Sequence, residues 1–376
     1  MIARGFTLTR EGRLDEALEV FLAAVAREPG AVDAHLAIYE VAQLLRRPEL
    51  ALEHQRRAIA LAPIHTARAR VAEELALLVP CVPGPFTANT PVEPLVDQDR
   101  VTIHRWYVDP AAPPPALPAH DLVWVAIGES AAARPALAAL PRLLAGDTAP
   151  IINDPALIAG LDRVTVAHRF AAGRVRVART ARISRAAYAA EGFPTPHIVR
   201  PVDAHGGHDL ERIDAPEDRH AYLARNDAPE LYVAEYVDYR SADGFFRKYR
   251  IIFVDGEPFP YHLAISSHWI VHYYNAGMRE NAWMREEEHR FLADLGAVFA
   301  GPLADALREV VALLPLDYFG IDCAIDRDGR LLLFEADTAL LVHLIDDPAL
   351  FGYKYAYVPK IRDAVGAMLR RRARRA

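Results

Sequence analysis

The sequence predicts an α/β protein that is preceded by an all-α domain. Three observations support this fold class. Residues 14–29 recur as residues 49–63, a strand, a helix and a strand follow one another over residues 122–152, and two Asp-Gly turns separate apolar runs further on. The chain has 376 residues, enough for two or three domains with cores of their own.

Helical repeats are predicted for residues 1–80. The recurring positions carry small or helix-ending side chains: Ala17 and Ala51, Ala24 and Ala58, Pro29 and Pro63. Their 34-residue spacing is that of the tetratricopeptide repeat, a helix-turn-helix unit. A further helix is expected over residues 66–78. Because such arrays usually need three or more repeats, we expect this domain to serve as a structural cap or as a groove for a peptide or protein.

Proline-rich sequence marks the next boundary. Residues 81–155 are predicted to form a linker and an N-terminal α/β subdomain, and residues 156–376 a second α/β domain. The expected helices cover residues 156–170, 182–191, 284–314 and 358–372, and the expected strands cover residues 196–201, 231–237, 248–254, 321–326 and 331–336. Asp255-Gly256 and Asp328-Gly329 supply the positive φ angles that hairpin turns require.

Composition narrows the functional class. The net charge of −7 gives no general reason to bind nucleic acid, and no apolar run is long enough to span a membrane. Cys81 and Cys323 lie too far apart in sequence to indicate a zinc site or a disulfide framework, so a cytoplasmic protein is expected. The arginine-rich residues 370–375 are either a solvated helix end or a contact for nucleic acid or phosphate.

A strand ending in Arg200 precedes a glycine-rich loop that contains His205, Gly206 and Gly207. A cation at a strand end, followed by backbone amides freed by glycine, suits a bound phosphate. Taken alone, the Gly-Gly pair is also typical of an ordinary turn.

Two further strands carry polar groups. Residues 230–238 read as an edge strand that ends in Glu235, Tyr236 and Val237. In the strand that follows, Lys248 and Arg250 share one face, because strand side chains alternate with period two. They are either surface ion-pair partners or contacts for an anionic ligand.

Three carboxylates lie on the hairpin of residues 317–337. Glu335 and Asp337 share a strand face, and hairpin pairing can bring Asp322 beside them. Hard oxygen ligands of this kind are what Mg²⁺ prefers, with Mn²⁺ as an alternative. The other interpretation is a set of surface acids.

Three segments, residues 196–210, 230–257 and 317–337, follow one another in this order. Together they resemble segments of the ATP-grasp ligases, a group that includes glutathione synthetase, D-alanyl-D-alanine ligase and the ribosomal-protein glutamate ligases. The resemblance covers about residues 120–370 and implies the ATP-grasp fold. It implies that Arg200 and the loop of residues 204–208 bind ATP phosphates, and that backbone groups near Glu235, Tyr236 and Val237 bind adenine.

The resemblance also assigns the reaction centre. It implies that Arg250 and Lys248 contact the reacting groups, and that Asp322, Glu335 and Asp337 hold two Mg²⁺ ions. This sequence has Arg200 where the family has lysine and Asp337 where it has asparagine, so phosphate geometry and metal preference are open.

The implied function is an ATP-dependent carboxylate–amine ligase that forms an amide through an acyl phosphate. The expected substrate is an amino acid, a peptide or a protein, with the helical repeats as its docking surface, and a homodimer is compatible with the sequence. The alternative is a degenerate nucleotide-binding scaffold in which the repeats carry the function. No Walker motif, G-x-S-x-G or dinucleotide-binding G-x-G-x-x-G occurs.

Histidines cluster among aromatic residues in the segment 260–275. His268 and His272 would share a face if this segment were helical, and His262 lies nearby. Their spacing does not match a zinc site. The remaining interpretations are a wall of the acceptor-substrate pocket, which the family resemblance suggests, and ordinary packing.

Overall fold

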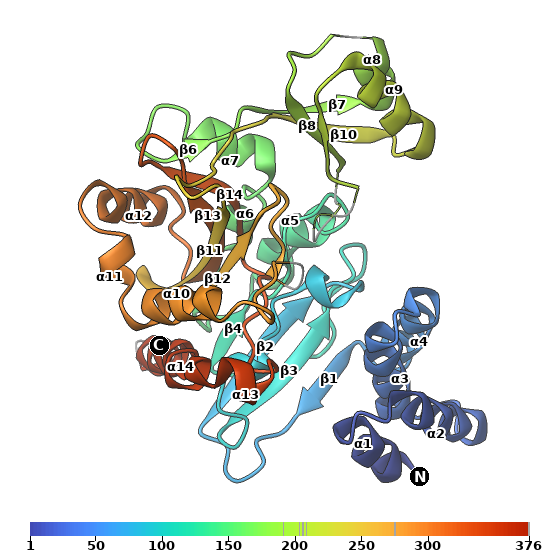
Figure 1. Cartoon of the computed structure of the whole chain (residues 1–376). Helices are drawn as coiled ribbons and strands as arrows, with labels where there is room; N and C mark the ends of the chain where they lie inside the picture. The colour runs from blue at the N-terminus through green and yellow to red at the C-terminus, as the bar shows by residue number, and fades with distance from the viewer. Residues whose placement is uncertain (191, 203, 205–206, 208, 274–275, 375–376) are drawn as a thin grey trace. The chain divides into compact units, whose positions relative to one another are not determined.

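The computed structural model describes residues 1–190, 192–202, 204, 207, 209–273 and 276–374. It shows a mixed α/β protein with three β-sheets (Figure 1). The chain divides into two compact units. The first contains Met1–Gly128, Ala132–Pro155 and Leu369–Ala376, and the second contains Glu129–Ala131 and Ala156–Met368.

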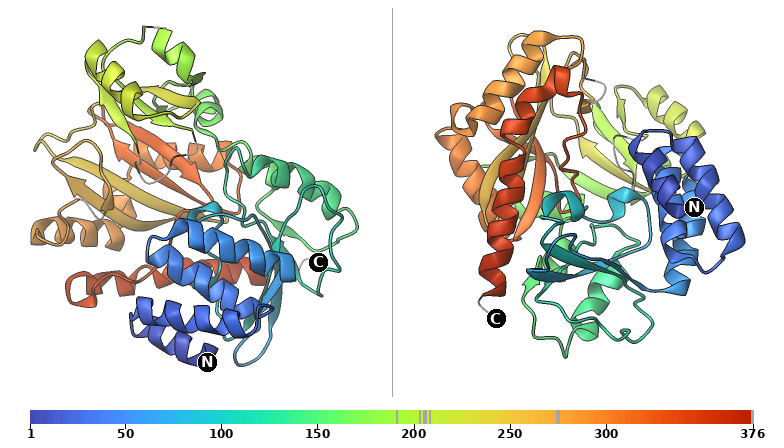
Figure 2. Two further views of the ribbon diagram at one scale, coloured as in Figure 1. Left: turned by 90° about the vertical axis from the view of Figure 1, so that its right-hand side faces the viewer. Right: turned by 90° about the horizontal axis from the view of Figure 1, so that it is seen from below.

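The first unit begins with four helices that lie side by side (Figures 1 and 2). They are α1 (Ile2–Arg10), α2 (Leu14–Arg27), α3 (Val32–Leu44) and α4 (Pro48–Leu61). All four recurring alanines are buried. A Cβ atom on Gly5 would lie 2.4 Å from the Phe21 ring, so glycine permits the close approach of α1 to α2. A helical segment at the N-terminus is confirmed, and its assignment to the tetratricopeptide repeats stays a prediction.

A five-stranded sheet completes the first unit. Its order is β1-β3-β2-β4-β5, with the edge strand β1 antiparallel to β3 and the other pairs parallel. The strands are β1 (Ile64–Ala67), β2 (Leu75–Cys81), β3 (Val101–Tyr107), β4 (Leu122–Trp124) and β5 (Ile151–Ile152), with helix α5 (Arg134–Leu143) between the last two.

The prediction of a helix over residues 66–78 is wrong, because this range contains the end of β1 and the start of β2. Residues of β2 are buried at every position, as in a strand that is covered on both faces. Such a short, continuous apolar run has no period that separates a buried strand from a buried helix.

The second unit contains a small antiparallel sheet with the order β7-β10-β8-β9. Its strands are β7 (Thr180–Ser184), β8 (His197–Pro201), β9 (Glu211–Ile213) and β10 (Glu230–Glu235), and helices α8 (Arg185–Ala190) and α9 (Pro216–Arg225) accompany them (Figure 1). Tyr188 from α8 and Tyr222 from α9 are buried in its core with Val199 and Leu231. The expected strands near β8 and β10 are confirmed, whereas the helix expected over residues 182–191 begins as strand β7.

The second sheet of this unit is the central sheet, with the order β12-β11-β13-β14-β6. Its strands are β6 (Arg176–Val177), β11 (Phe246–Val254), β12 (Glu257–Ser266), β13 (Tyr318–Ile325) and β14 (Leu331–Asp337). Both hairpin turns are confirmed, since Asp255 and Gly256 have φ angles of 50° and 81° and Gly329 has a φ angle of 74°.

The helices between residues 155 and 373 are α6 (Pro155–Ile158), α7 (Arg163–Arg169), α10 (Ala282–Ala293), α11 (Leu295–Val298), α12 (Pro302–Leu313), α13 (Pro348–Phe351) and α14 (Pro359–Ala373). The helix expected over residues 358–372 is confirmed by α14, whereas those expected over residues 156–170 and 284–314 are each divided into shorter helices. The single helix expected over residues 284–314 is broken because Gly301 has a φ of 54° and Pro302 starts a new helix. No helix in the described part of the chain could cross a membrane.

Candidate active site

Polar side chains form a row across four neighbouring strands of the central sheet. His262 on β12 lies opposite Arg250 on β11, which lies opposite Asp322 on β13, which in turn lies opposite Glu335 on β14. Asp337 follows two positions after Glu335 and therefore shares its face. The sequence prediction that hairpin pairing brings Asp322 level with Glu335 is confirmed by this register.

The centre of the row is an ion cluster around Asp322. Arg250 donates from Nε to Oδ1 at 2.6 Å and from Nη2 to Oδ2 at 2.9 Å, and Lys248 Nζ lies 2.8 Å from Oδ2. All three side chains are largely buried. Burial alone would raise the pKa of the Asp322 carboxyl, but the charges of Arg250 and Lys248 hold that pKa well below its usual range.

The β14 end of the row carries the other two carboxylates. Arg163, at the start of α7, donates from Nη2 to Glu335 Oε2 at 2.5 Å and from Nη1 to the Phe334 carbonyl at 3.0 Å. Asp337 accepts a hydrogen bond from the Ala339 amide at 2.9 Å. Burial and the nearby charge of Glu335 raise the pKa of Asp337 to about 7. These two carboxylates repel each other, and a cation between them would relieve the repulsion.

The three acids fit a metal ion unequally. Their carboxylate oxygens are the donors that a hard divalent cation prefers. Asp322 already accepts three hydrogen bonds from cations, out of about four lone-pair sites on a carboxylate. Among the described residues, no group of three His, Cys, Asp or Glu side chains is arranged to hold a metal. Glu335 and Asp337 therefore fit one divalent ion, and the full three-ligand set stays a prediction.

Arg200 lies on β8, opposite Tyr232 of β10, and only 8% of its surface is exposed. Its Nε and Nη2 atoms are buried and have no hydrogen-bond partner in the part of the chain that the structure describes. Burial, followed by repulsion from Arg163, lowers the pKa of Arg200 to about 10. Because buried donors are nearly always paired, this guanidinium is suited to an anionic ligand.

Ala204 and Gly207 are the members of the glycine-rich loop, residues 204–208, that the structure describes. Gly207 has a φ of 77°, which glycine adopts without strain. His205 and Gly206 lie outside the described residues.

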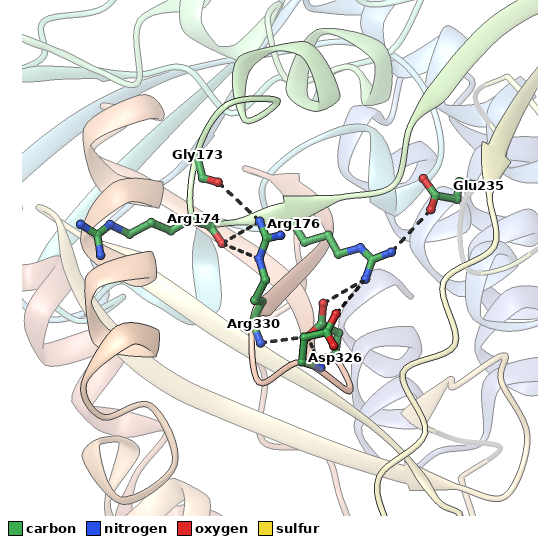
Figure 3. Close-up of polar contacts among 7 residues, drawn as sticks. Gly173, Arg174, Arg176, Glu235, Asp326 and Arg330 are labelled. Atoms are coloured by element: carbon green, nitrogen blue, oxygen red, sulfur yellow. Dashed lines mark hydrogen bonds and ion pairs between the residues drawn. The ribbon is translucent and has the colours of Figure 1, made fainter.

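Glu235 ends strand β10, and residues 236–245 connect the small sheet to β11 of the central sheet. Its carboxylate contacts Arg176 Nη2 at 3.5 Å and Arg179 Nε at 3.2 Å. Arg176 also contacts Asp326 in the β13–β14 turn at 3.2 Å (Figure 3). The Glu235 side chain is therefore occupied by arginines.

Tyr236 and Val237 follow in the connection itself. Arg212 lies 4.1 Å from the centre of the Tyr236 ring, and the Trp269 ring meets it edge-on at 5.8 Å. Within the described residues, no hydrogen bond of the Tyr236 or Val237 backbone amide is found. These amides are thus open to a ligand with hydrogen-bond acceptors.

The expected helix carrying His268 and His272 is not formed, because β12 extends from residue 257 to 266 and residues 267–272 have no helical structure. His262 lies in β12, is buried, and stacks on Tyr273 with ring centres 4.8 Å apart. Its Nε2 atom has no partner among the described residues. Burial and then Arg250 lower the pKa of His262 well below its usual value. His268 is exposed.

Residues that the sequence analysis missed support this site from outside it. Lys354, in the 3₁₀ turn Gly352–Ala356, lies 2.8 Å from Asp346 and 3.4 Å from the fully buried Glu288 of α10. Tyr273 donates to Glu288 at 3.1 Å, so this ion network holds the ring that stacks on His262. Arg163 was missed because its partner Glu335 is 172 positions away. No local pattern reports such a pair.

Comparisons with known proteins give distant structural likenesses. No protein-family model matches the chain, and no curated protein matches it. The solved structures that it resembles include D-alanine ligases and a RimK domain ATP-grasp protein. The D-Ala:D-Ser ligase VanG from Enterococcus faecalis is 12% identical and covers 79% of this chain and 100% of its own, with a TM-score of 0.49.

Two further structures show the same level of similarity. The D-alanine–D-alanine ligase of Bacillus anthracis, complexed with ATP, has a TM-score of 0.49 at 9% identity and covers 80% of this chain and 99% of its own. A RimK domain ATP-grasp protein from Sphaerobacter thermophilus has a TM-score of 0.41 at 15% identity, with 77% and 99% covered.

Proposed function

We propose that this protein is an ATP-dependent carboxylate–amine ligase. The observation that carries the proposal is Arg200, whose buried guanidinium has two unpartnered donors. Burial is the main cause of its lowered pKa, and smaller effects of the Arg163 and Glu335 charges relate it to the acidic end of the row. A polyphosphate would accept hydrogen bonds from the free donors of Arg200. It would also be attracted by the cations of the central sheet and by a metal ion that the carboxylates hold.

In the proposed reaction, a substrate carboxylate attacks the γ-phosphorus of ATP, ADP leaves, and an acyl phosphate forms. The amine then attacks the carbonyl carbon and releases phosphate, leaving an amide and a proton. Arg200 and the backbone amide of Gly207 bind the phosphates. Glu335 and Asp337 would hold Mg²⁺, which when bound supplies positive charge to the phosphate oxygens.

Arg250 is the residue best placed to hold the acyl group. Its Nε and Nη2 atoms are fixed by Asp322, and Nη1 takes no part in those contacts. A guanidinium that is anchored on one edge presents the remaining donor in a fixed direction, which favours a developing negative charge on the acyl oxygens. Lys248, on the same strand face, adds a second positive charge.

Adenine is assigned to the connection after β10. The backbone amides of Tyr236 and Val237 are suited to read the edge of the ring, and Glu235 is less suited because Arg176 and Arg179 already occupy its carboxylate. The assignment of adenine therefore stays with the backbone, as the family resemblance implies, and centres on Tyr236 and Val237.

The N-terminal helices are assigned to substrate docking. We infer that α1–α4 hold a peptide or protein segment and so orient its reacting group, since a helical array binds extended chains along its surface. A homodimer remains a further proposal.

A turnover assay tests the function. The full chain would be incubated with ATP, Mg²⁺ and a panel of amino acids and peptides, and ADP would be measured with the mass of any new amide. We expect ADP release that requires both a carboxylate and an amine, and a hydroxamate when hydroxylamine replaces the amine. ATP binding without turnover across the panel would instead support a nucleotide-binding scaffold.

A further inference from the structure

The cations around the three carboxylates are distributed unevenly. Asp322 contacts both Lys248 and Arg250, and Glu335 contacts Arg163. Among the described residues, Asp337 accepts a hydrogen bond only from the Ala339 amide, and no cationic side chain contacts it. The uncompensated negative charge therefore lies at the β14 end of the row.

Lys248 is fixed where a cation would sit on Asp322. Its side chain is only 15% exposed, and its ammonium lies 2.8 Å from Asp322 Oδ2, while Arg250 donates to both oxygens of the same carboxylate. A divalent ion bound to Asp322 would face two fixed positive charges at close range. Such an ion would also have to compete for the few lone pairs that remain on the carboxylate.

We propose that the Lys248 ammonium is a built-in cation at Asp322, so that the site takes one divalent ion, held by Glu335 and Asp337, in place of the two that the family resemblance implies. This inference rests on the proposed function, because the ion is expected to bind with nucleotide. The ammonium is covalently attached to the chain and cannot dissociate. Lys248 therefore takes the place of one of the two divalent ions.

The test counts metal ions directly. Mn²⁺ would be titrated into the full-length protein saturated with a non-hydrolysable ATP analogue, and free Mn²⁺ would be followed by electron paramagnetic resonance. We expect one tightly bound Mn²⁺ per wild-type chain. In Lys248→Met, a second Mn²⁺ should bind at least ~10-fold more tightly than in wild type, because one repelling charge near Asp322 is gone.

Two variants serve as controls. Lys248→Arg keeps the positive charge and should retain a single ion, and Lys360→Met removes an exposed lysine and should leave the count unchanged. Two tightly bound ions in wild type, or a single ion in a folded Lys248→Met variant, would overturn the role of Lys248 while leaving the ligase proposal intact. Failure of wild type to bind the analogue would overturn both.

Discussion

Arg250 and Asp322 face each other on neighbouring strands, and the guanidinium donates to both carboxylate oxygens at 2.6 and 2.9 Å. The pair gives the middle of the central sheet a cation that is anchored through Nε and Nη2, and no hydrogen bond of its Nη1 is found within the described residues. Bidentate pairing of this kind fixes direction as well as charge. Lys248 contacts the same carboxylate, so Asp322 pairs with two cationic side chains.

The first prediction concerns the stability of this cluster. Asp322→Asn leaves two largely buried cations without their counter-charge, so the free energy of unfolding should fall by about 3–5 kcal/mol in denaturant titration at pH 7. Asp328→Asn, on the exposed turn of the same hairpin, is the matched control. An Asp322→Asn variant as stable as the control would show that the cluster contributes little.

That difference should also depend on pH. The folded pKa of Asp322 lies below the ordinary value of about 3.9. A depressed acid pKa gives stability that is present above the unfolded pKa and is lost as pH falls through the folded pKa. The gap between wild type and Asp322→Asn should therefore be full at pH 7 and shrink only below about pH 4.

Arg200 provides the second prediction. Arg200→Ala should weaken ATP binding by roughly 10–100-fold in calorimetry, because charge-assisted hydrogen bonds contribute about 1.5–3 kcal/mol. Arg200→Lys should retain much of the affinity, since it keeps the charge but not the fork. Arg225→Ala, an exposed arginine on α9, should bind ATP as wild type does. Equal affinity in wild type and Arg200→Ala would place the phosphate cation elsewhere.

The third prediction concerns Glu335. Glu335→Gln keeps the shape of the side chain and removes its charge, so turnover should fall by at least ~10²-fold while the fold persists. Circular dichroism and thermal unfolding would check the fold, and Glu257→Gln, an exposed acid on β12, provides the comparison. Wild-type turnover in Glu335→Gln would remove this residue from the site.

The fourth prediction separates docking from capping by the N-terminal helices. The test uses a shortened chain that lacks α1–α4. This chain should begin at Pro63, because a start near Pro85 would also remove β2 from the middle of its sheet. The shortened protein should keep ATP binding and activity on a small amino-acid analogue, and lose activity chiefly on a peptide or protein. Insolubility or loss of ATP binding would show that the helices are mainly part of the fold.

The fifth prediction uses a buried histidine pair in those helices. His35 Nε2 lies 3.0 Å from the Pro29 carbonyl, and its Nδ1 lies 2.9 Å from His54 Nδ1. Burial, followed by His35, lowers the pKa of His54. The unfolded chain therefore binds more protons, and stability should fall as pH drops below about 6.5. His54→Gln should flatten this dependence in thermal unfolding between pH 5 and about 7, and an unchanged pH profile would contradict it.

Local chemistry explains which elements could be predicted from sequence. Asp255-Gly256 and Gly329 form their turns with positive φ angles that the sequence itself requires. The alternation of Glu335 and Asp337 likewise follows from strand geometry. Strand β2 was missed because its apolar run is continuous, so no period distinguishes strand from helix.

Contacts between distant segments explain what the sequence could not predict. The pairing of Arg163 with Glu335 and the network of Lys354 with Glu288 depend on how separate elements pack. The ion pair between Lys248 and Asp322 is another such case. Strand alternation predicts which face Lys248 lies on, but it does not predict which carboxylate Lys248 contacts. The sequence shows which side chains are charged, whereas the pairs that they form depend on the tertiary structure.

Arg176 joins Glu235, at the end of the small sheet, to Asp326 in the turn of the central hairpin (Figure 3). Its contact with Glu235 is long, at 3.5 Å, and both side chains are about one-third exposed. Ion pairs of this kind are worth only about 0–1 kcal/mol. The contact between Arg176 and Glu235 therefore contributes little to the free energy that holds the end of the small sheet beside the central hairpin.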